Sequence, residues 1–373
     1  MLEQTDDHER PAARRLDDAR IAQAVAARMA GARVLEIETL AADEDVDDGT
    51  HKVVGYGAPR RVRLATPAGE RTVVFHVQRP DAFGHDRRAD RAAAQLCAWD
   101  DFPRIPGHVA ALDVGAIGDD GRLISLAGTS ELYLVTEWIE GALYADDLRR
   151  IAAEGARAGD EARCDALAGY LARLHRPPLD AELTWRRSVR DLVGSGEGIF
   201  GMIDGYPDGT PGAPAERLRR IEHACLDWRW RLRHRSERLR TIHGDFHPFN
   251  VVFTDERDFR LLDASRGCAG DPADDVSAMA INYFFFALGR PRAWSSGLGA
   301  LWHRFFDQYR RQSGDDQLDA VLAPYLAWRG LVVASPSFYP SLPGESRERI
   351  LALVERTLSA ERFEPGFADE VLR

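Results

Sequence analysis

The sequence contains few cysteines, a single lysine and no excess of positive charge. Its four cysteines, Cys97, Cys164, Cys225 and Cys268, lie far apart and form no C-x-x-C pair, which argues against a disulfide scaffold and a zinc knuckle. The 49 basic and 60 acidic residues give a net charge of −11 at pH 7. Proteins that bind nucleic acid normally carry a basic face, so this charge argues against such a partner.

Long apolar segments are also missing. The N-terminal residues lack the apolar stretch of a secretory signal, and the longest apolar run, around residues 278–288, is too short to cross a bilayer. The composition, with 45% apolar and 29% charged residues, is that of a folded protein. We expect a cytoplasmic protein that does not bind a membrane. A length of 373 residues favours two packed units or one large bilobal domain.

The apolar pattern divides the chain into a strand-rich part and a helical part. Residues 1–33 are expected to form an N-terminal extension with a helix. Residues 34–138 form a predicted β-rich lobe, and residues 139–373 form a predicted lobe that is mostly helical. We therefore predict an α+β fold with a small N-terminal lobe and a larger C-terminal lobe.

The period of the apolar residues predicts the individual elements. Strands are predicted at 34–39, 52–55, 61–66, 71–78, 109–114 and 132–138. Helices are predicted at 16–29, 86–99, 146–154, 161–175, 215–235 and from 274 to the C-terminus. Two further short strands are expected to flank Asp245 and Asp263.

One short segment carries side chains that fit a catalytic site. In H-G-D-F-H-P-F-N, residues 243–250, Asn250 follows Asp245 by five residues, and Asp263 ends the next predicted strand. Phosphoryl transfer needs a carboxylate that accepts the proton of the attacking hydroxyl, and a carboxylate and an amide that hold Mg²⁺ against the phosphates. The spacing therefore predicts Asp245 as the general base, with Asn250 and Asp263 as the metal ligands. The alternative is that Asp245 is a turn carboxylate and Asn250 a cap.

This segment resembles the catalytic loop of the aminoglycoside phosphotransferase and choline kinase superfamily. The G-D-P-A-D-D segment at 270–275 and the L-A-R-L-H segment at 171–175 resemble two further elements of that family. The resemblance spans roughly residues 50–340. It implies a bilobal protein-kinase-like fold, ATP or GTP as the phosphoryl donor together with Mg²⁺, and a small-molecule hydroxyl as the acceptor.

Residues close to the loop also have structural interpretations. We expect His243 to pack and to hydrogen-bond the loop backbone rather than to take part in the chemistry. Asp271 precedes Pro272 and a helical pattern, so it is predicted to cap that helix. Asp274 or Asp275 is expected to complement the helix dipole or to support the catalytic loop.

The nucleotide is expected to contact the N-terminal lobe and the connection between the lobes. Gly55 and Gly57 lie between two predicted strands, where kinases place the glycine loop that covers the phosphates. The third glycine of that loop is missing, and a hairpin explains the two glycines as well. The predicted adenine site is the backbone of the four residues that lead into the second lobe, namely Thr136, Glu137, Trp138 and Ile139.

The cation for the phosphates departs from the family pattern. Kinases place lysine, and relatives in this family sometimes arginine, on the third strand, where this sequence has His76. A neutral imidazole is a weaker phosphate ligand than a permanent cation. Other candidates for the cation that binds the phosphates are therefore Arg61, Arg63 and Lys52. We include both His76 and Arg63 among the predicted nucleotide-binding residues. The departure keeps a second hypothesis open, a nucleotide-binding scaffold of the pseudokinase type.

The acceptor side leaves two interpretations open. The Gly-rich segment 194–205, with Glu197 and Asp204, is a predicted site for an amine or for hydroxyls, or else a mobile connection. A run of aromatic residues either faces the acceptor or forms helix core; it comprises Tyr283, Phe284, Phe285 and Phe286. Because a small molecule and a Ser or Thr of a peptide both fit, a peptide kinase on the same fold is a third hypothesis.

Overall fold

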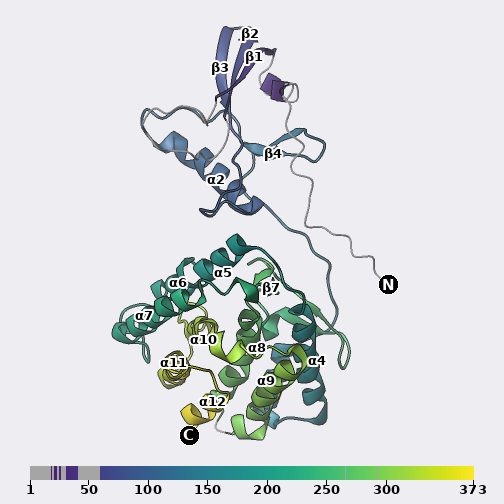
Figure 1. Ribbon diagram of the computed structural model, residues 1–373, viewed down its shortest axis with the longest axis vertical. Helices are drawn as coiled ribbons and strands as arrows, with labels where there is room; N and C mark the ends of the chain where they lie inside the picture. Colours follow the sequence, from purple (N-terminus) through teal and green to yellow (C-terminus); the bar gives the residue numbers. More distant parts are fainter. Residues whose placement is uncertain are drawn as a thin grey trace. The chain divides into compact units, whose positions relative to one another are not determined.

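The computed structural model describes residues 18, 21–22, 25–26, 31–40, 59–264, 266–290 and 292–373. The chain divides between Val135 and Thr136 into two compact units. Strands dominate the first unit and helices the second (Figure 1). The predicted fold class, a small β-rich part followed by a larger and mostly helical part, is confirmed.

A three-stranded antiparallel sheet forms the core of the first unit. Its strands, in spatial order, are β1 (Arg33–Thr39), β2 (Arg60–Thr66) and β3 (Gly69–Phe75). Side chains alternate along a strand, so β2 buries Val62 and Leu64 on one face, where they cluster with Ile21. The predicted strands at 34–39 and 61–66 are confirmed. The predicted strand at 52–55 lies outside the described residues.

The other face of this sheet carries ion pairs between neighbouring strands. The register places Glu38 of β1 opposite Arg61 of β2, and Glu36 opposite Arg63. Each arginine lies 2.7 Å from its glutamate. The guanidinium groups of β2 are therefore already neutralised within the sheet, although all four side chains remain partly accessible to solvent.

The prediction for the third strand was too long. We expected residues 71–78 to be extended, but β3 ends at Phe75. Phe75 pairs with Arg60, the first residue of β2, and beyond it Gln78 forms a single β-bridge rather than a continued strand. His76 consequently follows the strand, and its side chain is exposed.

The predicted strands at 109–114 and 132–138 were wrong. An extended segment needs a neighbour for its backbone N–H and C=O groups, and no described strand pairs with either segment. Instead, a small hairpin lies between them, formed by β4 (Gly115–Ile117) and β5 (Leu123–Ser125). The predicted helix at 86–99 is present as α2 (Arg88–Asp101).

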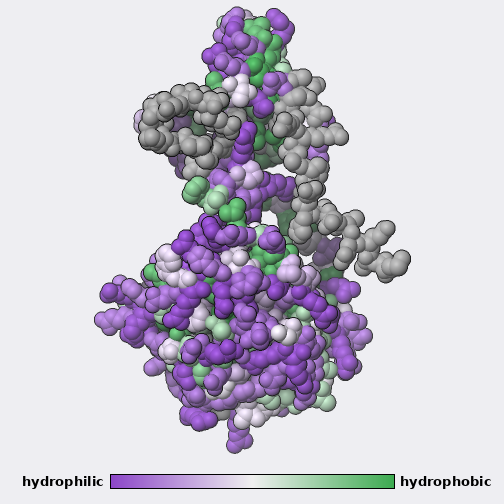
Figure 2. Space-filling view, in the orientation of Figure 1, coloured by the Kyte–Doolittle hydropathy of each residue, from purple (hydrophilic) through white to green (hydrophobic). Residues whose placement is uncertain are grey.

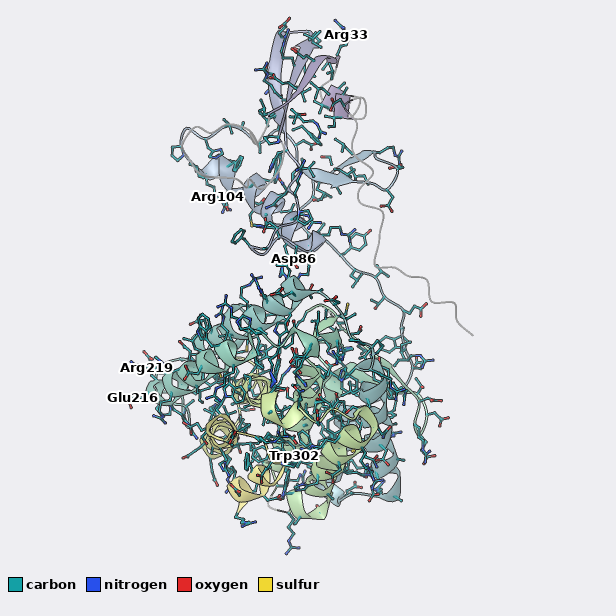
Figure 3. The ribbon with its side chains drawn as sticks, in the orientation of Figure 1. Arg33, Asp86, Arg104, Glu216, Arg219 and Trp302 are labelled. Carbon is teal, nitrogen blue, oxygen red and sulfur yellow. The ribbon has the colours of Figure 1, made fainter. Side chains whose placement is uncertain are left out.

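The second unit is built from helices around one large apolar core. In chain order they are α3 (Tyr144–Glu154), α4 (Ala158–Leu174), α5 (Glu182–Gly194), α6 (Ile199–Asp204), α7 (Ala215–Leu232), α8 (Pro272–Ala287), α9 (Gly299–Ser313), α10 (Leu318–Ala334), α11 (Gly344–Ser359) and α12 (Gly366–Leu372). Nearly every residue of α8 and α10 is buried, so these two helices form the centre of the unit. Trp302 is fully buried, whereas Glu216 and Arg219 point outward from α7 (Figure 3).

Two small sheets frame the segment that carries the sequence motif. One pairs β7 (Arg240–Thr241) with β10 (Ala269–Gly270), and the other pairs β6 (Ala142–Leu143), β8 (Val251–Phe253) and β9 (Phe259–Leu261) in that order. The short strands expected on either side of Asp245 and Asp263 are confirmed. The loop that carries Asp245 therefore runs from β7 into β8, and Asp263 follows the end of β9.

The surface of the helical unit is mostly hydrophilic in the view of Figure 2. None of the helices in the described part of the chain has the length and apolar character needed to cross a membrane.

Candidate active site

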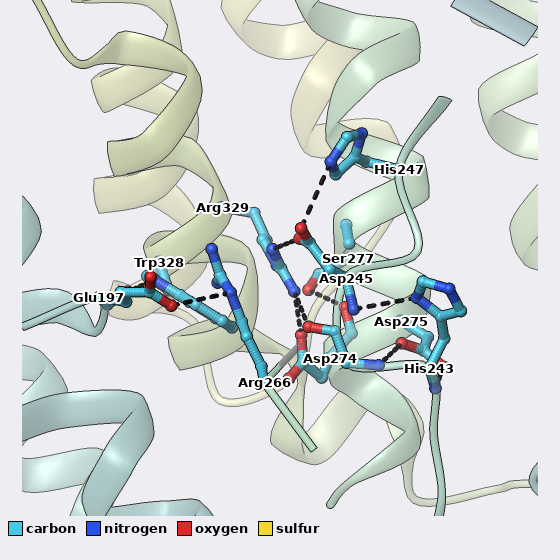
Figure 4. A network of polar contacts seen from close by, with 12 residues as sticks. Glu197, His243, Asp245, His247, Arg266, Asp274, Asp275, Ser277, Trp328 and Arg329 are labelled. Atoms are coloured by element: carbon cyan, nitrogen blue, oxygen red, sulfur yellow. Dashed lines mark hydrogen bonds and ion pairs between the residues drawn. The ribbon is translucent and has the colours of Figure 1, made fainter. Parts of the chain in front are cut away.

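One buried carboxylate, that of Asp275, fixes the backbone of the loop between β7 and β8. Asp275, in the first turn of α8, accepts hydrogen bonds from the backbone N–H groups of His243 at 2.7 Å and Gly244 at 2.9 Å (Figure 4). Asp275 also contacts Nε2 of His175 at 3.1 Å, and Nδ1 of His175 lies 2.9 Å from the hydroxyl of Tyr309. The loop conformation is thus tied to α4, α8 and α9. Of the two roles expected for Asp274 or Asp275, support of this loop is the one that Asp275 shows.

A second carboxylate caps the same helix. Asp271 accepts a hydrogen bond from the backbone N–H of Ala273 at 2.9 Å, and Pro272 occupies the first helical position. The buried guanidinium of Arg238 donates two hydrogen bonds to Asp271, both of 2.7 Å, and two more to Asp315. The predicted capping role of Asp271 is confirmed, and the start of α8 is held rigidly beneath the loop.

Asp245 lies at the open side of this loop. Its Oδ1 accepts a hydrogen bond of 2.7 Å from Arg329, whereas its Oδ2 has only longer contacts, 3.4 Å to His247 and 3.5 Å to Asn250. Burial raises the pKa of Asp245, but the hydrogen bond with His247 opposes it. The positive charges of Arg329 and Arg266 act in the same direction as His247, so the pKa of Asp245 lies well below its ordinary value. The carboxylate is therefore ionised at neutral pH.

Arg329 is the partner that sequence reasoning missed. It projects from α10, is 4% exposed, and also donates to the backbone carbonyl of Gly244 at 2.9 Å and to the carboxylate of Asp274. Its guanidinium lies 3.9 Å from the ring centre of Trp328. Burial raises the pKa of Asp274 to about 6 against the opposing charge of Arg329. A charge in the apolar middle of a helix was the available signal, because a buried charge needs a partner.

The two predicted metal ligands are brought together by the β8–β9 pair. Val251 pairs with Leu261, and the N–H of Leu262 donates to the carbonyl of Asn250 at 2.9 Å, so Asp263 follows directly beside Asn250. The side-chain amide nitrogen of Asn250 donates to the backbone carbonyl of Asp245 at 3.1 Å. The side-chain oxygen of Asn250 is then the atom that can bind a cation.

Asp263 has an unusual backbone conformation. Its φ of 42° is the one positive value recorded for a residue other than glycine in the described part of the chain. Such a conformation is disfavoured for a residue with a Cβ and is often retained at functional sites. It turns the chain away from β9 and leaves the carboxylate exposed.

The donor set fits Mg²⁺ better than a transition metal. The described residues contain no group of three or more His, Cys, Asp or Glu side chains that could hold a metal ion. Mg²⁺ usually keeps several waters and is bound through one or two carboxylates and substrate phosphates, so Asn250 and Asp263 are sufficient in number.

Residues 55–325 match the family model described as the phosphotransferase enzyme family. The chain belongs to this family. No curated protein matches the sequence. Similar solved structures include a glucosamine kinase, with 18% identity, coverage of 88% of this chain and 92% of that chain, and a TM-score of 0.42. An ethanolamine kinase from Plasmodium vivax has 11% identity, coverage of 91% and 81%, and a TM-score of 0.34. The family assignment rests on the sequence match alone.

The predicted nucleotide-binding residues of this phosphotransferase lie partly within the described chain. Gly55 and Gly57 lie outside the described residues. Arg63 is ion-paired with Glu36 in the sheet, and His76 is exposed after β3. The segment predicted as the adenine site, Thr136 to Ile139, starts the second unit without regular secondary structure. Nucleotide binding by these residues stays a prediction.

The aromatic run on α8 is only partly buried. Tyr283 and Phe284 are fully buried, so of the two interpretations left open the core interpretation holds for them. Phe285 and Phe286 are only partly buried. The Gly-rich segment contains α6 rather than being only a connection, and within it Glu197 forms an ion pair of 3.3 Å with Arg266 (Figure 4).

Proposed function

We propose that this phosphotransferase moves the γ-phosphoryl group of ATP or GTP onto a hydroxyl of a small molecule. The observation that supports the proposal most is that Asp245 and Asn250 lie close together on one loop. Asp263, which follows β9, lies beside them. Family membership supplies the reaction class. The loop is held by Asp275 and Arg329, so its functional side chains are preorganised rather than mobile.

Asp245 is proposed to orient the attacking hydroxyl and to receive its proton. Oδ1 is engaged by Arg329, which leaves Oδ2 as the oxygen that faces the acceptor. A carboxylate with a lowered pKa is a weak base, so its main contribution is to align the hydroxyl. The proton then transfers late, because phosphoryl transfer generally proceeds through a loose transition state.

Asn250 and Asp263 are proposed to hold Mg²⁺. The ion, when bound, neutralises the charge of the transferring phosphates. The amide bond from Asn250 to the backbone of Asp245 couples the ligand to the base, so both are positioned by the same loop. The exposed carboxylate of Asp263 is accessible to an ion that arrives with the nucleotide.

Nucleotide contacts by Gly55, Gly57, His76 and the backbone of the segment from Thr136 to Ile139 complete the proposal. The test is a thermal-shift screen with ATP and GTP, with and without Mg²⁺, followed by transfer of labelled γ-phosphate to a panel of hydroxyl compounds. We expect Mg²⁺-dependent stabilisation by a nucleotide and transfer to at least one small molecule. Nucleotide binding with no transfer to any acceptor would favour the scaffold hypothesis, and transfer only to peptides would favour the peptide kinase.

A further inference from the structure

Four aromatic side chains form a continuous, partly exposed surface beside the catalytic loop. Phe249 of the loop lies 6.3 Å from Phe286 of α8, Phe286 lies 5.6 Å from Phe285, and Phe285 lies 4.8 Å from Tyr339, measured between ring centres. Each of the four is partly buried and partly accessible. We call these four residues the aromatic wall.

The wall starts near Oδ2 of Asp245, the oxygen that Arg329 does not contact. The ring of His247 lies 5.8 Å from that of Phe249, and Nε2 of His247 lies 3.4 Å from Oδ2 of Asp245. His247 also fixes the loop, because its Nδ1 accepts a hydrogen bond from the backbone N–H of Phe249 at 3.2 Å. A molecule that lies on the wall can therefore present a hydroxyl to Oδ2, where it would compete only with the longer contacts from His247 and Asn250.

A guanidinium already lies over the wall. Arg149 of α3 is 5.3 Å from the ring centre of Phe249 and 6.0 Å from that of Phe286. Its side chain is 54% exposed and pairs with Asp146 of the same helix, which is itself 61% exposed. An exposed pair of this kind holds its arginine only weakly, so Arg149 can interact with a ligand.

The charge of Arg149 determines what the wall accepts. An ammonium ion binds aromatic rings through their faces, but the guanidinium of Arg149 is already bound to these two rings. Two positive charges at contact distance repel each other, whereas a carboxylate or an uncharged polar group gains a hydrogen bond from the guanidinium. Apolar ring faces of a sugar or an aromatic compound pack against the phenylalanines without any charge.

We propose that the aromatic wall is the acceptor subsite, and that it selects ring-shaped hydroxyl compounds that are anionic or uncharged over amines. The proposal rests on the proposed function, because it takes Asp245 as the residue that receives the acceptor hydroxyl. Of the aromatic run at 283–286, the wall includes only Phe285 and Phe286. Phe249 and Tyr339 complete it.

The test measures binding of a matched series of probes, the phenyl glycosides of glucuronate, glucose and glucosamine, which share two apolar faces and differ in charge. We expect wild type to bind the glucuronide and the glucoside about two- to fivefold more tightly than the glucosaminide, in the range of one exposed cation–π contact. Arg149→Glu should reverse this order. Phe286→Ala should weaken all three probes about equally. The matched control is Arg349→Glu, an exposed arginine paired with Glu345 on α11, which should change nothing.

Several outcomes would overturn the subsite. These are tightest binding of the glucosaminide by wild type, an unchanged order in Arg149→Glu, full binding by Phe286→Ala, and no binding of any probe. Calorimetric binding is measured without a nucleotide, so it does not depend on transfer. Binding in the expected order without transfer of γ-phosphate would leave the wall intact and contradict the proposed function instead.

Discussion

Arg329 donates a 2.7 Å hydrogen bond to Asp245 across 84 residues of sequence. The same guanidinium binds the carbonyl of Gly244 and the carboxylate of Asp274, and it packs on the ring of Trp328. One side chain of a C-terminal helix therefore fixes both the backbone and the carboxylate of the catalytic loop. The orientation of the proposed base depends on packing between α10 and α8.

Replacing Arg329 should affect turnover more than nucleotide binding. In Arg329→Met the carboxylate of Asp245 loses a charge-assisted bond worth about 1.5–3 kcal/mol, so we expect kcat to fall by about 10-fold to 100-fold with a small change in the nucleotide Kd. Arg329→Lys keeps the charge and should recover part of the loss. Steady-state kinetics and calorimetry check this.

The matched control for Arg329 is Arg356→Met. Arg356 also lies over an aromatic ring, 3.7 Å from the centre of Phe367, but far along the chain from the loop. We expect its removal to leave kcat unchanged. If Arg329→Met lowers only the free energy of unfolding and Arg329→Lys restores no activity, Arg329 has no positioning role.

Asp263→Asn should remove the Mg²⁺ dependence of nucleotide binding. The substitution keeps the shape of the side chain but deletes the charge that would hold the ion. We expect nucleotide and Mg²⁺ together to raise the Tm of wild type but to give the variant no more stabilisation than nucleotide alone. Chelation of Mg²⁺ should make wild type behave like the variant. The control is Asp258→Asn, which changes an exposed aspartate in the turn between β8 and β9. An unchanged Mg²⁺ response in Asp263→Asn would exclude Asp263 as a ligand.

Asp315 provides a pH-dependent contribution to stability. Burial raises the pKa of Asp315, but hydrogen bonds and the charge of Arg238 outweigh it, and the pKa lies below its ordinary value. A carboxyl group whose pKa is lowered by folding stabilises the fold at pH values above its ordinary pKa near 4. This contribution is lost as the pH falls through the pKa of the folded state. Asp315→Asn should therefore lower the free energy of unfolding by about 1–3 kcal/mol at pH 7.

The difference between wild type and Asp315→Asn should shrink once the pH falls below about 4. Denaturant unfolding at neutral and acidic pH measures it. Asp316→Asn, an exposed neighbour, should behave like wild type at both values. A difference that stays constant down to the acidic range would show that Arg238 does not act through the ionised form of Asp315.

His76 and Arg63 should differ in their effect on nucleotide affinity. Arg63 is already paired with Glu36 at 2.7 Å, so we expect Arg63→Ala to change the nucleotide Kd little. His76 is exposed just beyond β3, and His76→Ala should weaken binding by about 1–3 kcal/mol if a charge-assisted bond to phosphate is lost. Calorimetric titration of both variants with the nucleotide checks this. If both variants bind the nucleotide with the same affinity, another residue supplies the cation, and Lys52 is the next to test.

Local spacing predicted the parts of the site that depend on neighbouring residues. The cap at Asp271 follows from a Gly-Asp-Pro sequence before a helical run, and the five-residue interval from Asp245 to Asn250 lies within one loop. The strands around Asp245 and Asp263 were predicted for the same reason. Arg329 was missed because its partner is 84 residues away, and a pattern along the chain carries no information on which helix meets which loop.

The errors in the strand prediction have a similar cause. Residues 109–114 and 132–138 have the apolar character of strands, but a strand also needs a partner, and the sequence does not specify one. The end of β3 at Phe75, which pairs with the first residue of β2, was likewise not marked in the sequence. On α8 the buried pair Tyr283 and Phe284 and the partly exposed Phe285 and Phe286 are consecutive residues near the end of a helix that is buried almost all round, so the helical period does not separate them.

The most direct test of the central claim compares wild type with Asp245→Asn in two measurements made side by side. Calorimetry gives the affinity for the nucleotide in the presence of Mg²⁺, and labelled γ-phosphate gives the rate of transfer to the best acceptor of the panel. The account predicts that Asp245→Asn binds the nucleotide as wild type does and transfers phosphate about two to four orders of magnitude more slowly, the range for loss of a general base. Equal loss of binding and transfer, or transfer at the wild-type rate, would contradict the assignment of Asp245 as the base.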